Sequence, residues 1–234
     1  MNNQLETLLR HWHAERDTLN WVLVTVISTE GSSYRRPGAM MLLNDSGEQF
    51  GLVSGGCLES DVLKHARQCW HLGSSKRITY DMREEGDLAW NLGIGCGGKI
   101  DVLLQPIKAE NDYLQLDRVY HALEKDLSGF YAQPINSKQP EGMWSTDETV
   151  QPDWLSFAIQ PAPTILILGG GMDAVPVVNM GHQLGWKMWV NDPRPRYARR
   201  SDFADAQRGS NIAPMALVEH EHLAKVSAVI IMHH

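Results

Sequence analysis

Two of the three cysteines lie directly beside glycines, which is the most chemically suggestive pattern in the sequence. Cys57 occurs in GLVSGGCLESDV (residues 51–62), and Cys96 occurs in GIGCGGKID (residues 93–101). The glycines that flank them are Gly55, Gly56, Gly95 and Gly97. Because glycines carry no side chains, a bulky ligand has room to approach either thiol. The alternative is that both cysteines are small buried residues at the corners of tight turns.

A helix is predicted to begin at Cys57, which places this thiol near the positive end of a helix dipole. The dipole and the unpaired amides of the first turn favour the thiolate over the thiol. A thiolate is a soft metal ligand and a nucleophile, suited to metal contact or to carrying transferable sulfur. Cys69, by contrast, lies inside the same predicted helix and is expected to be a small core residue.

The segment GSSYRRPGA (residues 31–39) offers groups for an anionic ligand. Arg35 and Arg36 can make charge-assisted hydrogen bonds, and Ser32 and Ser33 supply hydroxyl donors. The alternative is a solvated basic loop. Glu59, two residues after Cys57, could orient a ligand or accept a proton. The alternative is that, as an acid in the first turn of a helix, it only interacts favourably with the helix dipole.

The cysteines and histidines do not form a recognisable metal-binding pattern. Three cysteines cannot close a disulfide framework, and their spacing lacks the paired CxxC units of a zinc site. The ten histidines are scattered, and those at His11, His13, His220 and His222 have no partner cluster in the sequence. No metal site is therefore assigned to the histidines.

The elements that must position these residues alternate between strands and helices. Helices are predicted at residues 3–19, 57–73 and 111–126, and strands at residues 21–29, 39–44, 50–56, 75–81 and 99–107. Residues 129–160 mix short strand-like pieces and predict a hairpin. The sequence QPAP (residues 160–163) then indicates a boundary. These patterns predict a mixed α+β domain over residues 1–160.

Residues 161–234 follow a different pattern. TILIL is a buried strand, and the turn after it contains Gly169, Gly171 and Ala174 in the spacing G-x-G-x-x-A. Asp192 ends the next apolar strand. This strand–turn–helix context is the dinucleotide-binding fingerprint, in which the glycines permit a tight turn and a close pyrophosphate. The fold class is therefore α/β, with a Rossmann-like parallel domain that is expected to be truncated, since the last strand is KVSAVIIMHH.

Composition excludes several classes of protein. The net charge of −7 argues against a general nucleic-acid binder. No apolar run approaches the roughly 18 residues that span a bilayer, so no membrane association is expected. The first residues lack a basic start followed by an apolar stretch, so no secretion signal is predicted and a cytoplasmic location is expected.

The chain resembles the xanthine dehydrogenase accessory protein family, also called the XdhC/CoxI family, over nearly its whole length. The motifs that carry the resemblance are STEGSSYRRPGAMMLL, GLVSGGCLE and WNLGIGCGG, in this order, followed by the nucleotide-type fold and NDPRPRYARRSDFADA. Family members commonly show Ser-Ser-x-Arg in the first motif, which favours Arg35 over Arg36 as the arginine that contacts an anionic ligand. They also continue well past the point where this sequence stops, which implies a truncated or shortened member.

The resemblance implies a chaperone rather than a stand-alone enzyme. Its cargo would be the molybdenum cofactor (molybdopterin), which it binds, helps to sulfurate and inserts into a xanthine dehydrogenase-type molybdenum hydroxylase. A cysteine desulfurase is the implied sulfur donor. On this reading Cys57 and Cys96 handle sulfur or contact molybdenum through the cofactor, and their thiols should lie close enough to share one ligand. Arg35, Ser32 and Ser33 would hold the pterin phosphate.

Two other functions remain open on the residues alone. One is an NAD(P)-dependent oxidoreductase that uses the glycine turn and Asp192, although no acid–base set of the usual kind accompanies it. The other is a nucleotide-sensing module without catalysis. Dinucleotide binding is expected to be weak, because the binding crevice needs strands from both halves of the sheet and only the first half is clearly encoded in this sequence. A homodimer is expected, because symmetric dimers are the commonest assembly.

Overall fold

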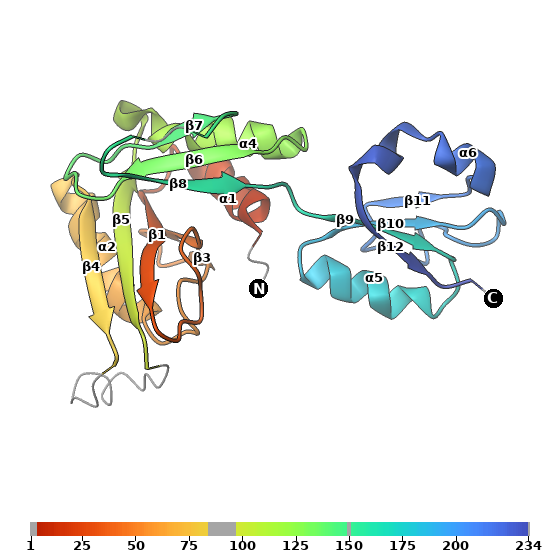
Figure 1. The fold of residues 1–234 in the computed structure, drawn as a ribbon, viewed down its shortest axis with the longest axis horizontal. Coiled ribbons are helices and arrows are strands. Elements are labelled where there is room, and N and C mark those ends of the chain that lie inside the picture. The colour runs from red at the N-terminus through yellow and green to blue at the C-terminus, as the bar shows by residue number, and fades with distance from the viewer. Residues whose placement is uncertain (1–3, 84–96, 149–150, 234) are drawn as a thin grey trace. The chain divides into compact units, whose positions relative to one another are not determined.

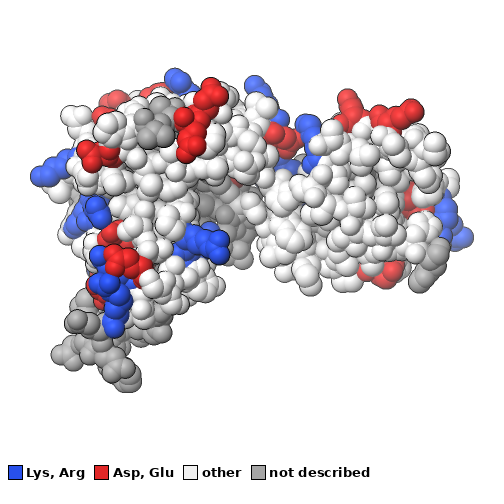
Figure 2. All heavy atoms as spheres, viewed as in Figure 1, with Lys and Arg blue, Asp and Glu red and all other residues white. Residues whose placement is uncertain are grey.

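The computed structural model describes residues 4–83, 97–148 and 151–233, so Cys96 and Gly95 lie outside the described residues. Contacts divide the chain into two compact units, one of Leu5–Gln160 and one that starts at Pro161 (Figure 1). No described helix has the length and apolar character needed to cross a membrane. On the face shown in Figure 2, basic and acidic side chains are interspersed over the described surface.

The N-terminal unit is built on a five-stranded antiparallel sheet in the order β3-β2-β1-β5-β4. Its strands are β1 (Trp21–Glu30), β2 (Met40–Asn44), β3 (Gln49–Gly51), β4 (Lys76–Asp81) and β5 (Lys99–Ile107). The side chains of β1 alternate between two cores: Trp21 and Leu23 enter one, and Val22 and Val24 enter the other. The central strand is therefore buried on both faces, which explains why its apolar residues do not alternate with polar ones over residues 21–24.

Different layers cover the two faces of this sheet, as Figure 1 shows. One face packs against α2 (Glu59–Leu72). The other packs against α1 (Leu5–Glu15), α4 (Leu116–Glu124) and a second antiparallel sheet in the order β7-β6-β8. The strands of that sheet are β6 (Gly129–Pro134), β7 (Met143–Ser145) and β8 (Trp154–Ile159). The hairpin predicted at residues 129–160 is thus part of a three-stranded sheet.

The two largest errors in the predicted boundaries of this unit lie at the end of one strand and at the start of one helix. The strand expected over residues 50–56 ends at Gly51, whose φ of +84° turns the chain where a Cβ would lie 2.7 Å from Met40 O. The helix expected at 111–126 begins at Leu116. Before it, the 3-10 segment η1 (Ala109–Gln115) contains left-handed residues from Asp112 to Gln115, with φ between 50° and 56°. Helical spacing of apolar residues does not reveal such a local change of hand.

The C-terminal unit is a four-stranded parallel sheet in the order β11-β10-β9-β12. Its strands are β9 (Thr164–Leu168), β10 (Lys187–Asn191), β11 (Arg208–Ser210) and β12 (Val226–Ile231). α5 (Ala174–Gln183) contributes to the core on one face, and α6 (Pro214–Val218) to a smaller core on the other. A short 3-10 segment, η2 (Glu221–Lys225), leads into β12. The predicted mixed α/β class with a Rossmann-like parallel domain is confirmed.

The position of β12 corrects one sequence-based expectation. It pairs with β9 on the side opposite β10, so the strand order reverses beside β9. That reversal is the topological switch point at which doubly wound folds bind ligands. The expectation that the sheet holds strands from its first half alone is therefore wrong, because KVSAVIIMHH forms a strand beyond the switch.

Candidate functional site

The turn before α2 is held by a buried carboxylate. Glu59, 4% exposed, accepts hydrogen bonds from the Ser54 amide (3.0 Å), the Ser54 hydroxyl (2.5 Å) and the Leu58 amide (3.1 Å). The Ser54 hydroxyl in turn accepts from the amides of Gly56 (3.2 Å) and Leu58 (3.1 Å). The backbone amides of Ser54, Gly56 and Leu58 are thus satisfied by side chains of the turn itself, and α2 begins at Glu59 rather than at Cys57.

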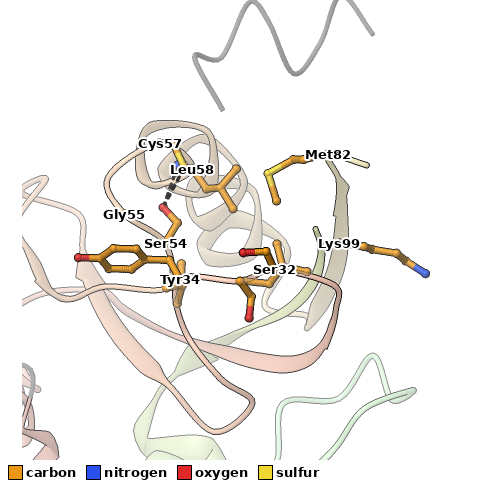
Figure 3. Close-up of a pocket in the computed structure, with 11 residues that line it drawn as sticks. Ser32, Tyr34, Ser54, Gly55, Cys57, Leu58, Met82 and Lys99 are labelled. Carbon is orange, nitrogen blue, oxygen red and sulfur yellow. Dashed lines mark hydrogen bonds between the residues drawn. The ribbon is translucent and has the colours of Figure 1, made fainter. Parts of the chain in front are cut away.

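Cys57 lies in this turn and packs in part against the core between the sheet and α2. Its thiol is half-buried, and Sγ donates to the Ser54 hydroxyl over 3.5 Å (Figure 3). Gly56 has a φ of +106° and open space around its Cα, so no side chain shields the thiol there. The sequence-based expectation of room beside Cys57 agrees with this geometry.

The loop after β1 meets the start of β5 without intervening side chains. A Cβ on Gly98 would lie 1.9 Å from the carbonyl oxygen of Ser32 and 2.9 Å from that of Glu30. A Cβ on Gly31 would lie 3.4 Å from Gly97 O. The serine loop therefore packs against the last two residues of the GCGG motif. This contact joins segments that are far apart in the sequence.

A shallow hollow of about 20 Å³ lies between the loop after β1 and the turn before α2. Of the predicted site residues, Ser32, Ser33, Gly55 and Cys57 line it. Sequence reasoning did not single out the other residues that line it, which are Tyr34, Val53, Ser54, Leu58, Met82, Lys99 and Ile100. Figure 3 shows that they come from the loop after β1, the turn before α2, and the ends of β4 and β5. Gly97 does not line the hollow, and it is exposed with a φ of +64°.

Two of the missed residues had signals in the sequence. Ser54 precedes the paired glycines and lies five residues before Glu59, a spacing at which a hydroxyl can cap the turn into a helix. Tyr34 lies between the serines and the arginines. Its ring is 69% exposed yet lies 3.3 Å from the position of a Cβ on Gly55. An exposed aromatic ring beside a glycine is an available stacking surface for a planar ligand.

The two arginines of this loop differ in setting. Arg36 is exposed, whereas Arg35 is half-buried and its Nε is buried without a hydrogen-bond partner among the described residues. Burying a hydrogen-bond donor without an acceptor costs free energy, and an anionic ligand would supply the missing acceptor. Arg35 is not among the residues that line the hollow. Its role in anion binding remains a prediction that this unpaired Nε supports.

We expect the two described cysteines to react at very different rates. Burial raises the pKa of the Cys69 thiol to about 11, an effect that Lys76 opposes only partly. Iodoacetamide at pH 8 should therefore label Cys57 and leave Cys69 unmodified in the folded protein, because only the thiolate reacts. Peptide mass spectrometry over time measures both sites, and urea-unfolded protein is the control in which both react. Equal rates in the folded protein would contradict this assignment.

A Gly98→Ala substitution should separate the serine loop from β5. Both atoms that the new methyl group would meet are backbone oxygens and cannot rotate away. We expect a loss of about 1–3 kcal/mol in the free energy of unfolding, the usual cost of overpacking. Gly97→Asn is the matched control, because nothing lies within 4 Å of a Cβ there and asparagine tolerates a positive φ. Similar melting temperatures for the two variants would refute the close contact.

In the C-terminal unit, the glycine turn after β9 is packed by the protein itself. A Cβ on Gly169 would lie 2.6 Å from Met232 O, and one on Gly171 would lie 2.4 Å from the Asp173 carboxylate. Close packing of β12 is thus one reason for glycine at position 169, where φ is +124°. The Asp173 carboxylate beside Gly171 would repel the diphosphate that such turns bind.

The Asp192 carboxylate already has hydrogen-bond donors within the C-terminal unit. Its carboxylate is fully buried and accepts hydrogen bonds from the Gly170 amide (2.9 Å) and from the Arg194 amide (3.0 Å), Nε (2.9 Å) and Nη2 (2.7 Å). The Arg194 guanidinium and these amides outweigh burial and hold the pKa of Asp192 well below its usual range. The geometry thus gives Asp192 a structural role, tying the glycine turn to the end of β10. It disfavours the predicted contact of Asp192 with a cofactor.

The histidines are less scattered than the sequence indicates. His13 on α1 lies beside Asp117 and His121 of α4, so the expectation that it has no partner cluster is wrong. His11 stacks on Phe50 instead, with ring centroids 4.5 Å apart. His220 and His222 contact one another, but among the described residues no third potential ligand atom lies within 4.8 Å of both.

Fold and site together define a two-part protein, in which a thiol-bearing α+β unit with a hydroxyl-lined hollow accompanies a Rossmann-type unit. Comparison with family models gives the same division. The XdhC and CoxI family model matches residues 14–81, and the XdhC Rossmann domain model matches residues 165–234. The chain belongs to the XdhC and CoxI family.

Individual relatives agree with this assignment. The chain is 31% identical to a Bacillus subtilis protein named as a probable subunit of xanthine dehydrogenase, over 91% of the chain and 72% of that protein. It is 23% identical to the "Molybdenum cofactor insertion chaperone PaoD" of Escherichia coli, over 76% of the chain and 54% of that protein. A crystal structure described as a xanthine dehydrogenase from Bacillus halodurans superposes with a TM-score of 0.83 at 30% identity, covering 98% of the chain and 75% of that structure.

Proposed function

We propose that this protein binds the molybdenum cofactor as cargo and inserts it into a xanthine dehydrogenase-type molybdenum hydroxylase. Family membership and the likeness to a relative named as a molybdenum cofactor insertion chaperone support the class of function. The observation that carries the proposal is the half-buried Cys57 thiol on a hollow that Ser32 and Ser33 also line.

The residues of the hollow match the chemistry of such a cargo. The Cys57 thiolate is a soft donor suited to the molybdenum end. Ser32 and Ser33 can donate hydrogen bonds to a phosphate. Arg35 lies outside the lining of the hollow, and its unpaired Nε could add a charge-assisted hydrogen bond only from the neighbouring part of the loop. The exposed ring of Tyr34 can stack on the planar pterin. Ser54 and Glu59 hold the turn so that the thiol keeps its position.

The finer part of the proposal is sulfuration. We propose that the cofactor receives its sulfur while it is bound beside Cys57, with Cys96 as a second thiol and a cysteine desulfurase as donor. The open space at Gly56 would let a partner protein approach the Cys57 thiol and transfer sulfur to the bound cofactor. NAD(P) binding is expected to be weak, because Asp192 is occupied and Asp173 places a negative charge beside the glycine turn.

Cofactor retention tests the proposal. Protein purified without oxygen from cells that make the cofactor should contain molybdopterin, measured as its fluorescent oxidation product. Cys57→Ala should lose most of it, and Cys69→Ala should not. Arg35→Ala should bind about 10- to 150-fold more weakly, the equivalent of a charge-assisted hydrogen bond of about 1.5–3 kcal/mol, whereas Arg36→Ala should change little.

Three results would overturn parts of the proposal. Bound NAD(P) in place of molybdopterin would favour an oxidoreductase or a nucleotide sensor. Full retention by folded Cys57→Ala protein would remove the thiol from the site. Unchanged affinity in Arg35→Ala protein with an unchanged melting temperature would remove that guanidinium.

A further inference from the structure

A second cluster of potential ligands lies on α1 and α4, apart from the hollow beside Cys57. His13 of α1 and Asp117 and His121 of α4 each offer one ligand atom, and these atoms all lie within 4.8 Å of one another. His13 Nε2 is 3.4 Å from Asp117 Oδ1. The cluster faces solvent on one side, since the side chains of His13 and Asp117 are 31% and 29% exposed. A solvent-borne cation can therefore reach it.

Neighbouring side chains orient both imidazole rings. His121 Nδ1 is 3.1 Å from Glu124 Oε2, which leaves Nε2 of His121 to act as a ligand. A carboxylate behind a histidine is the usual outer partner of a metal-binding imidazole. The His13 ring rests on Tyr120, with centroids 4.6 Å apart.

The guanidinium of Arg16 is a nearby cation that would compete with a metal ion for the Asp117 carboxylate. It contacts Asp117 Oδ1, the same oxygen that faces His13. The arginine also has other contacts, since it lies 5.2 Å from the centroid of the Tyr113 ring and 3.5 Å from Asp17 Oδ2. A metal ion would therefore bind Oδ2 of Asp117, with Oδ1 keeping its hydrogen bond as ligating carboxylates commonly do, or it would displace Arg16 from Oδ1.

We propose that His13, Asp117 and His121 bind a divalent transition-metal ion of the zinc class, with solvent as the fourth ligand, and so join α1 to α4. Two imidazoles and one carboxylate suit zinc, cobalt or nickel, whereas magnesium and calcium prefer oxygen ligands alone. Zinc–ligand distances are about 2.0–2.2 Å, so the ligand atoms need to move closer by side-chain rotation. The exposed His121 has the freedom to do so.

Binding of Zn²⁺ and Co²⁺ to the full chain tests this site. Metal-free protein, with its reactive thiols blocked by iodoacetamide, is titrated by calorimetry, and Co²⁺ absorption reports tetrahedral coordination. We expect one equivalent to bind, and His121→Asn and Asp117→Asn to weaken it more than about 100-fold. Glu124→Gln should weaken it about 10- to 100-fold, as an outer partner does. His71→Asn, an exposed histidine of α2, is the matched control and should bind normally.

The outcomes separate a metal site from a plain ion-paired contact between the helices. A melting temperature that rises with Zn²⁺ in the original protein and not in His121→Asn supports the site. Equal Zn²⁺ affinity in the original protein and His121→Asn would overturn it, as would the absence of any binding to the original protein. His121 is 56% exposed at its side chain, so its replacement should leave the metal-free fold unchanged, which circular dichroism checks.

Discussion

Replacing Glu59 with alanine is expected to release the turn that carries Cys57 and to lower the free energy of unfolding by about 2–4 kcal/mol. The carboxylate is buried and accepts from two backbone amides and one hydroxyl. Each buried donor left without its acceptor costs about 1–3 kcal/mol, although Leu58 keeps its second acceptor on Ser54. The same variant should lose cofactor retention, because the thiol no longer has a fixed position.

Two further variants distinguish this role from a simple helix-dipole effect. Glu59→Gln keeps one acceptor oxygen and should lose about half as much stability. Asp61→Asn removes another first-turn acid of α2 and should cost less, since dipole effects are about 0.3–1 kcal/mol. Urea unfolding gives the energies, and hydrogen exchange of residues 53–62 locates the change. Equal, small losses in all three variants would show that Glu59 acts only on the dipole.

Asp192→Ala should destabilise the C-terminal unit by about 2–4 kcal/mol. Its carboxylate is buried and joins the glycine turn to Arg194, and breaking such an arrangement leaves buried donors unpaired. The lower end of this range takes into account that the Arg194 side chain is 50% exposed and can be rehydrated. Asp202→Asn, which removes an exposed pairing with Arg199, is the control and should change stability by less than about 1 kcal/mol.

The pH dependence of Asp192 has a definite sign. Because its pKa is lower in the folded state, its contribution is complete above the unfolded-state value of about 3.9 and is lost as the pH falls below that value. The original protein should therefore lose stability more steeply than Asp192→Ala between about pH 4 and pH 2. Hydrogen exchange in peptides of residues 164–192 follows this unit separately. Parallel pH profiles for the two proteins would refute the predicted coupling.

The sequence predicted the fold class because the strands and the glycine turn have strong local signals. The apolar residues of β1 at positions 21–24 reflect burial on both faces, and the spacing of Gly169, Gly171 and Ala174 marks the turn after β9. The boundaries failed where a backbone torsion rather than side-chain spacing decides the element. Gly51 and the left-handed residues of η1 are the two examples.

The site was only partly predictable, because its contacts join distant segments. The hydroxyls and the thiol were identified by residue type, and four of the predicted residues line one hollow. The packing of Gly98 on Ser32, and the grouping of His13 with Asp117 and His121, depend on how strands and helices pair in three dimensions. Asp192 fits the fingerprint by position, but Arg194, two residues later, occupies its carboxylate. A motif gives the position of a carboxylate without showing its hydrogen-bond partners.

The small size of the hollow beside Cys57 has a kinetic consequence for the proposed delivery. With a volume of about 20 Å³ it is far below the roughly 300–1,000 Å³ of small-molecule sites, so a large cofactor would be held by one end with much of its surface uncovered. A recipient enzyme could contact that uncovered surface before the cofactor dissociates from this protein. Transfer would then proceed through a short-lived three-component complex, and the cofactor would not be released into water. Its rate should therefore rise with recipient concentration and exceed the rate of spontaneous cofactor loss.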